Sequence, residues 1–327
     1  MSPSYHDITA AYDRIQPMII KTPLLTSERL NDKLGFRLFL KAEPLQRTGS
    51  FKFRGACNAI VSLPEEMRSV IAFSSGNHAQ AVALVARLTG RKATIIMPKD
   101  APQAKIEGTK AYGANVILYD RYTESREEIG AQLSQETGAV LIKPYDDEAV
   151  ISGQGTIGIE LANQIKDQHI TPHQILCCAG GGGLISGLSI AIKHHHPNTD
   201  IFSAEPSGFD DIKRSLATGE IEKNDPEARS ICDAIVTPQP GEMTFPIMKR
   251  HLTGGYVVSD DDCLRAMNSC WRYLKIVTEP GGVVAFAAAL QQSQSSDLKG
   301  KDVIAIASGG NCDIDLFGRA LSLSDAI

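Results

Sequence analysis

Short apolar runs alternate with stretches of helical periodicity along the first half of the chain. The apolar runs are 70–73, 93–97 and 116–119, and the predicted helices are 77–88, 103–112 and 123–135. Short apolar runs separated by helices are typical of parallel strands joined by crossovers. This part of the chain is therefore predicted to form a parallel sheet flanked by helices.

A similar rhythm returns later in the chain. Apolar runs at 174–179, 201–204 and 303–307 are predicted strands, with helices at 184–193 and at the C-terminus. They predict a second doubly wound sheet, so the fold class is α/β with two open, mostly parallel sheets. In such sheets ligands bind beyond the carboxyl ends of the strands.

Length, charge and composition indicate the number of domains and argue against nucleic-acid and membrane partners. With 327 residues the chain exceeds what one hydrophobic core usually supports, so we expect two domains. A net charge of -5 without a long basic run argues against nucleic acid as a partner. The longest apolar runs, such as 283–290, are too short to cross a membrane, and the first residues do not read as a secretory signal. We therefore expect a cytoplasmic protein without membrane association.

The seven cysteines form neither a disulfide framework nor zinc-type spacings, and we expect them to be reduced.

Four motifs carry the candidate chemistry, and each follows a predicted strand. They are Gly49-Ser50-Phe51-Lys52-Phe53-Arg54-Gly55-Ala56, Ser74-Ser75-Gly76-Asn77-His78, Gly180-Gly181-Gly182-Gly183 and Ser308-Gly309-Gly310-Asn311. Because the carboxyl ends of parallel strands face one crevice, we expect the motifs to meet there.

Lys52 is predicted in the first turn of a helix. The positive end of the helix dipole disfavours its ammonium form, which makes a free amine accessible near neutral pH. An imine-forming lysine needs this property. Taken alone, a lysine at a helix start is far more often an exposed surface charge.

The glycine run at 180–183 lies between an apolar run and a helix. In that context backbone N–H groups can bind a phosphate. No Lys-Ser/Thr pair follows, so it is not a Walker loop, and it is not a dinucleotide fingerprint. A cofactor with a single phosphate suits it better, although an ordinary tight turn is the alternative.

Taken in this order, the four motifs resemble those of the fold-type II pyridoxal phosphate enzymes. Within these the chain resembles the serine racemase and threonine/serine dehydratase family, from about Thr22 to Asn311. Threonine dehydratases typically have alanine at position 75, whereas serine racemases and hydroxyaspartate dehydratases have serine, as here. The resemblance implies a large cofactor-binding domain of residues 1–68 and 146–327, a small domain of 69–145, and a homodimer.

The resemblance also implies a cofactor site for pyridoxal 5'-phosphate. Lys52 would bond to it covalently, Asn77 would bind its 3-hydroxyl oxygen, and Ser308 would lie beside its pyridine nitrogen. The glycine loop would hold the phosphate, and the other positions lining the ring would be Phe51, Gly241 and Glu279. A hydroxyl beside the ring nitrogen makes the ring a weaker electron sink, which favours elimination. On sequence alone, Phe51 could be a core residue, and Asn77 and Ser308 could be caps.

For the substrate, the resemblance implies binding by Ser74, Ser75, Asn77 and His78. The hydroxyl of Ser75 could exchange the Cα proton on the face opposite Lys52, which would allow racemisation. It could equally bind a carboxylate or cap a helix.

Two basic residues bear on a dicarboxylic substrate. Arg126 matches an arginine that reaches dicarboxylic ligands in the racemase branch, although it could be one more exposed helical arginine. Lys143 stands where relatives usually have histidine, and it bears on a second carboxylate only if it faces the pocket.

A divalent cation is the second cofactor that the resemblance implies. Glu205, the carbonyl of Phe209 and Asp211 would bind magnesium, manganese or calcium through hard oxygen ligands. The alternative is a solvated acidic loop.

The expected activity is that of a dehydratase, or ammonia-lyase, acting on serine, threonine or 3-hydroxyaspartate. The products would be a 2-oxo acid and ammonia. Racemisation of serine or aspartate by Lys52 and Ser75 is the first alternative, and a non-catalytic module that binds a phosphorylated small molecule is the second. Because the chain ends soon after Asn311, we expect no C-terminal regulatory domain of the kind found in allosteric threonine dehydratases.

Overall fold

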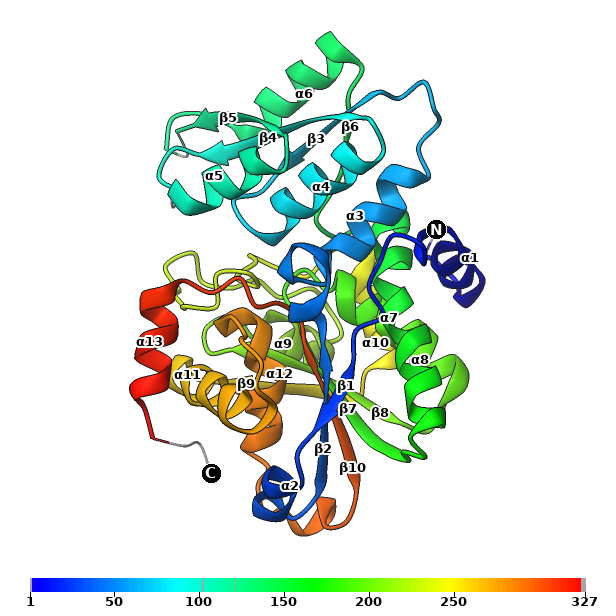
Figure 1. Cartoon of the computed structure of the whole chain (residues 1–327), viewed down its shortest axis with the longest axis vertical. Helices are drawn as coiled ribbons and strands as arrows, with labels where there is room; N and C mark the ends of the chain where they lie inside the picture. Colours follow the sequence, from blue (N-terminus) through cyan, green and yellow to red (C-terminus); the bar gives the residue numbers. More distant parts are fainter. Residues whose placement is uncertain (1, 102, 121, 325–327) are drawn as a thin grey trace.

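The strands form two separate sheets in the computed structural model, which describes residues 2–101, 103–120 and 122–324 (Figure 1). The six-stranded sheet has the order β1-β2-β10-β7-β8-β9. Its strands are β1 Leu24–Thr26, β2 Arg37–Ala42, β7 Pro172–Cys178, β8 Asp200–Pro206, β9 Gly254–Val258 and β10 Asp302–Ala307. All neighbours pair in parallel except β1 and β2. Since β10 lies between β2 and β7, distant parts of the chain share this sheet.

The four-stranded sheet is parallel throughout and has the order β5-β4-β3-β6. Its strands are β3 Ser69–Phe73, β4 Lys92–Pro98, β5 Asn115–Tyr119 and β6 Val140–Leu141. Figure 1 shows it at the top of the molecule, away from the larger sheet. The α/β class and the two mostly parallel sheets predicted from the sequence are confirmed.

Helices flank both sheets (Figure 1). Their bounds are α1 Tyr5–Ile15, α2 Glu28–Leu34, α3 Lys52–Val61, α4 Asn77–Leu88, α5 Gln103–Ala111, α6 Arg126–Thr137, α7 Glu148–Asp167, α8 Gly183–His195, α9 Asp211–Thr218, α10 Thr244–His251, α11 Asp260–Ser269, α12 Pro280–Leu290 and α13 Ile314–Ser322. Short 3-10 turns lie at Glu43–Leu45, Arg47–Gly49 and Ser296–Leu298, and a π turn at Cys270–Leu274. The helix predicted at 123–135 begins three residues later, because Ser125 caps it by accepting from the Glu128 N–H.

Two main hydrophobic cores correspond to the two sheets. One fills the larger sheet and includes the whole of α12, which is buried. The other joins β3 and β4 to the apolar face of α3, including Phe53, Ala56 and Ile60. Thus α3 precedes the predicted small domain in sequence but packs against its sheet. The domain boundaries at 68/69 and 145/146 stay a prediction.

Glycines let α7 and α8 pack closely. A Cβ added at Gly187 of α8 would overlap the Ile151 carbonyl and lie 2.6 Å from the backbone nitrogen of Gly155. Real Cβ atoms do not approach backbone so closely, so glycine is needed there. The contact holds the first half of α8 directly against α7.

A fully buried ion cluster holds α3 in place. Arg54 of α3 contacts Glu43, in the 3-10 turn after β2, and Glu160, in α7, each at 2.8 Å. Lys41 of β2 contacts Glu160, also at 2.8 Å. Because an unpaired buried charge is very costly, the four groups need one another.

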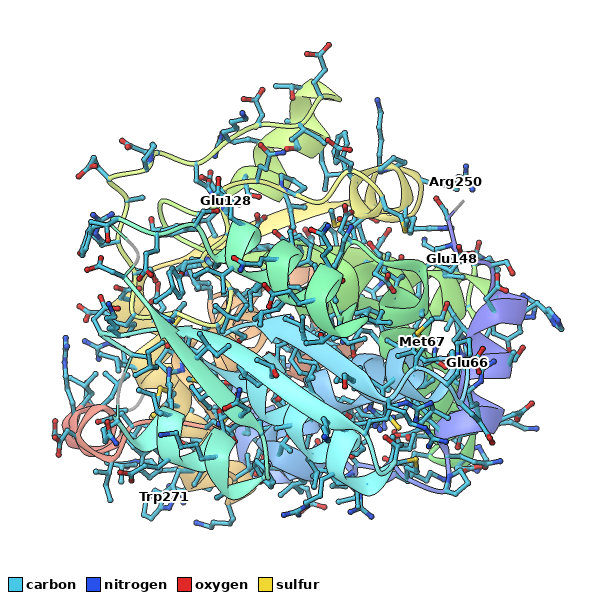
Figure 2. All side chains as sticks on the ribbon, turned by 90° about the horizontal axis from the view of Figure 1, so that it is seen from above. Glu66, Met67, Glu128, Glu148, Arg250 and Trp271 are labelled. Atoms are coloured by element: carbon cyan, nitrogen blue, oxygen red, sulfur yellow. The ribbon has the colours of Figure 1, made fainter. Side chains whose placement is uncertain are left out.

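Charged side chains cover the outside of the molecule. Glu66, Glu128, Glu148 and Arg250, labelled in Figure 2, are examples of exposed charged residues. Within the described residues, no helix combines the length and apolar character that a membrane span requires.

Candidate functional site

A cavity of about 310 Å³ lies where the ends of several strands meet the starts of several helices. The predicted residues that line it are Phe51, Lys52, Ser74, Ser75, Asn77, His78, Arg126, Gly180, Gly181, Gly182, Gly183, Glu279 and Ser308. Gly241 is not in the lining, but its N–H donates to the Gly181 carbonyl at 3.2 Å. Lys143 is exposed and is not in the lining.

Five helices begin at residues that line this cavity or adjoin its lining: α3, α4, α6, α8 and α12. Glycines precede α4 and α8, so no side chain caps either helix at Gly76 or Gly182. The first N–H groups of a helix lack partners within it and carry the positive end of its dipole. The cavity is therefore suited to anionic groups such as a phosphate and a carboxylate.

The glycine loop between β7 and α8 lies tightly against its neighbours. Gly182 has a φ of 88°, which favours glycine. A Cβ at Gly181 would overlap the ring of Tyr145, and one at Gly180 would lie 2.8 Å from the Ile235 carbonyl oxygen. Larger residues would displace this loop, which presents an uncapped helix start to the cavity. These features fit the phosphate of a bound cofactor.

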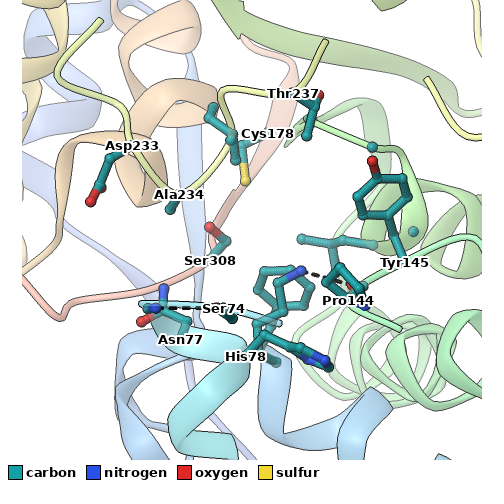
Figure 3. Close-up of a pocket in the computed structure, with 18 of the residues that line it drawn as sticks. Ser74, Asn77, His78, Pro144, Tyr145, Cys178, Asp233, Ala234, Thr237 and Ser308 are labelled. Atoms are coloured by element: carbon teal, nitrogen blue, oxygen red, sulfur yellow. Dashed lines mark hydrogen bonds between the residues drawn. The ribbon is translucent and has the colours of Figure 1, made fainter. Parts of the chain in front are cut away.

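Lys52 is the first residue of α3, as its sequence context predicts. Its Nζ donates to the Pro144 carbonyl at 2.8 Å and lies 5.1 Å from the centroid of the Phe51 ring. Figure 3 shows Pro144 beside Tyr145 at one wall of the cavity, with Ser308 and Cys178 across from them. Enclosure by protein atoms lowers the pKa of Lys52 to about 8. The direction agrees with the expectation, and burial is its largest cause.

Backbone hydrogen bonds join the Lys52 segment to the end of β10. The Phe51 N–H donates to the Ser308 carbonyl at 3.0 Å, and the Gly310 N–H donates to the Gly49 carbonyl at 2.9 Å. Two of the four motifs are therefore tied through their main chains.

Two polar side chains beside Lys52 are held by specific partners. Asn77 Nδ2 donates to Glu279 Oε1 at 2.6 Å, and burial raises the pKa of Glu279 to about 7. His78 Nε2 lies 2.9 Å from the Ile142 carbonyl, which can only accept, so Nε2 carries the proton. Burial, and then the charge of Lys52, lowers the pKa of His78 to about 3. His78 is therefore neutral at physiological pH.

Sequence reasoning missed several lining residues. Lys105 of α5 pairs with Asp233 at 2.6 Å, and both line the cavity. Cys178 ends β7, and hydrogen bonds from Cys177 and with Ser308 hold its pKa below the usual range. Tyr145 and Thr237 face the cavity from two further loops (Figure 3). Of these, only Cys178 had a signal, its place at the end of an apolar run before the glycines.

The predicted cation residues lie outside this cavity, at the end of β8 and the start of α9. Glu205 accepts from Ser203 Oγ and from the N–H groups of Ile212 and Lys213 at 2.8–3.0 Å. Burial, and then the charge of Asp211, raises the pKa of Glu205 to about 8.

Burial likewise raises the pKa of Asp211 to about 6. Its Oδ2 atom is buried and has no hydrogen-bond partner among the described residues. In the described part of the chain, no three His, Cys, Asp or Glu side chains form a metal centre. The two buried carboxylates nevertheless fit a bound cation, because their pKa values are raised and one oxygen of Asp211 lacks a partner. A backbone carbonyl would be the third oxygen ligand.

Residues 15–309 match the family model "Pyridoxal-phosphate dependent enzyme", and the chain belongs to that family. It is 44% identical to L-threo-3-hydroxyaspartate ammonia-lyase of Saccharomyces cerevisiae, covering 98% of this chain and 97% of the relative. It is 40% identical to serine racemase of Schizosaccharomyces pombe, covering 98% of each.

Among solved structures, maize serine racemase superposes with a TM-score of 0.91 at 38% identity, covering 98% of this chain and 97% of that one. The predicted resemblance to the serine racemase and hydroxyaspartate dehydratase branch is confirmed. The chain is therefore a pyridoxal phosphate-dependent enzyme with lyase or racemase activity.

We expect covalent attachment of pyridoxal phosphate to Lys52 to follow the lowered pKa of this amine. Only the neutral amine attacks an aldehyde, so the attachment rate should rise with pH and level off above about pH 8. An ordinary exposed lysine would continue to gain rate up to about pH 10.4. The rate can be followed by trapping with borohydride at a series of pH values and by mass spectrometry of the Lys52 peptide. Lys52→Ala is the control, and a rate still rising above pH 9.5 would contradict this expectation.

Proposed function

We propose that this enzyme is an ammonia-lyase for small β-hydroxy amino acids and that 3-hydroxyaspartate is its preferred substrate. The observation that carries the proposal is that the Lys52 amine, the uncapped start of α8 and a basic residue, Arg126, line one cavity. The names of the relatives from Saccharomyces cerevisiae and Paracoccus denitrificans, both acting on a hydroxyaspartate, also support it. Serine and threonine are the other candidates.

Bound pyridoxal phosphate supplies an aldehyde that bonds to amines and a ring that withdraws electrons from the substrate's Cα. The first N–H groups of α8 bind its phosphate, together with the loop at Gly180, Gly181, Gly182 and Gly183. Asn77 donates to the ring oxygen, and Ser308 binds beside the ring nitrogen. As a hydroxyl, Ser308 leaves that nitrogen without the proton that a carboxylate would hold there, which favours loss of a β-substituent.

Lys52 acts as the base that removes the Cα proton. Its pKa of about 8 leaves a usable fraction of neutral amine near neutral pH. The β-hydroxyl leaves with a proton as water, and hydrolysis of the released product gives a 2-oxo acid and ammonia. Ser74, Ser75 and the uncapped start of α4 bind the substrate's α-carboxylate, next to the neutral His78.

Arg126 gives the preference for a dicarboxylate, because its guanidinium can bind a second carboxylate. Lys105 also lines the cavity, where Asp233 pairs with it, and Thr237 Oγ1 is buried without a partner among the described residues. Lys143 is exposed and has no part in this proposal.

Replacing Arg126 tests the proposed substrate. In Arg126→Ala, kcat/KM for L-threo-3-hydroxyaspartate should fall about 10- to 100-fold, the worth of one charged hydrogen-bond pair. The value for L-serine should change by less than about threefold, because serine lacks the second carboxylate. Formation of 2-oxo acid measures both. Arg87→Ala, an exposed arginine of α4 outside the cavity, is the matched control. An equal loss for both substrates would refute the role of Arg126.

Serine racemisation is the second candidate function, and the presence of Ser75 in the cavity lining favours it. A second proton-exchanging group opposite Lys52 would return the Cα proton to the other face. In Ser75→Ala, the ratio of D-serine formed to 2-oxo acid formed from L-serine should fall at least about tenfold. Chiral chromatography with an oxo-acid assay measures the ratio, and an unchanged ratio would remove Ser75 as the second base.

We further propose that Glu205, Asp211 and the Phe209 carbonyl bind magnesium, manganese or calcium as a structural cation. A cation would neutralise two carboxylates whose burial raises their pKa values and would give a partner to the orphaned Asp211 oxygen.

Adding the cation should therefore raise the melting temperature of the parent protein, and a chelator should reverse the gain. Asp211→Asn should lose this response, whereas Glu227→Gln, at a carboxylate 87% exposed, should keep it. Differential scanning calorimetry measures the response. If Asp211→Asn responded like the parent protein, the cation would have to bind elsewhere.

The family resemblance also supports a homodimer in the cytoplasm. The seven cysteines are free thiols, in keeping with a reducing compartment.

A further inference from the structure

Side chains from three separate segments form one directed chain of hydrogen bonds beside the cavity, starting at the carbonyl of Thr48. This carbonyl accepts from Asn311 Nδ2 at 2.7 Å. The same Nδ2 atom also donates to Asn77 Oδ1 at 2.7 Å. Asn77 Nδ2 in turn donates to Glu279 Oε1 at 2.6 Å. This series of hydrogen bonds thus runs from the turn before Lys52 to the start of α12.

The partners at both ends determine which way each amide is turned. An asparagine side chain has two N–H donors on one side and an accepting oxygen on the other. Since the Thr48 carbonyl can only accept, Asn311 must turn its NH₂ group toward it. The second N–H of Asn311 then needs an acceptor, so Asn77 must present its oxygen. The NH₂ group of Asn77 is thereby directed to Glu279 and the cavity.

The backbone conformation of the turn before Lys52 makes room for this series of hydrogen bonds. Thr48 has a φ of 59°, a left-handed conformation that non-glycine residues seldom adopt, and Gly49 has a φ of 74°. A Cβ added at Gly49 would overlap Asn311 Oδ1, and one at Gly309 would overlap Glu279 Oε1. The two glycines let the Asn311 amide and the Glu279 carboxylate lie directly against the main chain. A strained turn maintained in this way points to a functional constraint.

One donor of Asn77 is left for a ligand. Asn77 lines the cavity, and in the part of the chain that the structure describes its second N–H has no acceptor. Figure 3 shows Asn77 at the wall of the cavity near Ser308 and Ser74. A ligand atom bound beside this NH₂ group must be an acceptor. If the amide were reversed, the same atom would meet an oxygen.

We propose that Asn311 is a positioning residue for pyridoxal phosphate, which fixes the Asn77 amide so that an N–H, and not the carbonyl oxygen, faces the cofactor's ring oxygen. Glu279 completes the arrangement as the acceptor at the far end. The inference rests on the proposed cofactor site, in which Asn77 binds that oxygen. It adds that Asn77 can do so in only one orientation, which residues outside its own motif determine.

Asn311→Asp tests this role. A carboxylate can donate neither to Thr48 nor to Asn77, and it faces Asn77 Oδ1 with like charge. The Asn77 amide should therefore turn over, donate to Asp at position 311 and present its oxygen to the cofactor. The dissociation constant for pyridoxal phosphate should rise at least about tenfold, as expected for a lost hydrogen bond to a charged oxygen. The visible absorption band of the bound cofactor should shift in wavelength or in pH dependence, because its ring oxygen loses a donor.

Asn163→Asp is the matched control. It makes the same substitution at an exposed asparagine of α7 that does not line the cavity, so the Asn77 amide keeps its orientation. Cofactor affinity should stay within about threefold of the parent value. The melting temperature of each apoprotein, measured without cofactor, separates loss of binding from loss of fold. A merely structural role for Asn311 would lower that temperature and leave the absorption band of the loaded protein unchanged.

The outcomes are distinct. Weak binding with a shifted band in Asn311→Asp, together with normal binding in Asn163→Asp, supports the inference. Parent-like binding in Asn311→Asp, or an equal loss in both variants, overturns it. If Asn311→Asp does not fold, Asn311→Ala takes its place, and parent-like affinity there also overturns it. If the parent protein itself binds no pyridoxal phosphate, the proposed function fails, and not this inference alone.

Discussion

The position of Lys52 depends on a buried charge cluster two residues further along α3. Arg54 is held by Glu43 on one side and by Glu160 of α7 on the other, and Lys41 of β2 balances the second carboxylate. All four side chains are almost completely buried, so none can turn to water for compensation. The cluster therefore joins α3, β2 and α7. Since Lys52 is the first residue of α3, the cluster also fixes the position of its amine.

The cavity is a product of how two sheets are joined. In each sheet the strands are almost all parallel, so their carboxyl ends and the helices that follow face the same region. The helices α3, α4, α6, α8 and α12 begin at or beside the cavity, and their positive ends make it attractive to anions. Tyr145 and Asp233 come from connecting loops and close the remaining sides. Burial in the same cavity lowers the pKa of Lys52, so the available amine lies where an anion can bind.

Many of the strands, helices and cavity residues could be predicted, because they depend on local patterns in the sequence. Apolar runs and helical periodicity located β3, β4, β5, β7, β8 and β10 to within about two residues, and they located α4 to the residue. The glycine run and the three other motifs identified about half of the cavity lining, since each follows a strand. Strand β9 and helix α7 were missed. The strand Gly254–Val258 begins with two glycines, and the helix carries glycines at 153, 155 and 158, so both contain residues that usually interrupt such elements.

By itself, then, the sequence determined the fold class, the family and many of the residues that line the cavity, because periodicity and motif order depend only on neighbours along the chain. Tertiary structure alone decided which residues those side chains contact. It brought Asn311 against Asn77, and Lys105 against Asp233, across more than a hundred residues in each case. It also showed that burial sets the pKa of Lys52, a quantity that depends on every atom packed around the amine. Such contacts arise from how distant segments pack, which no local pattern records.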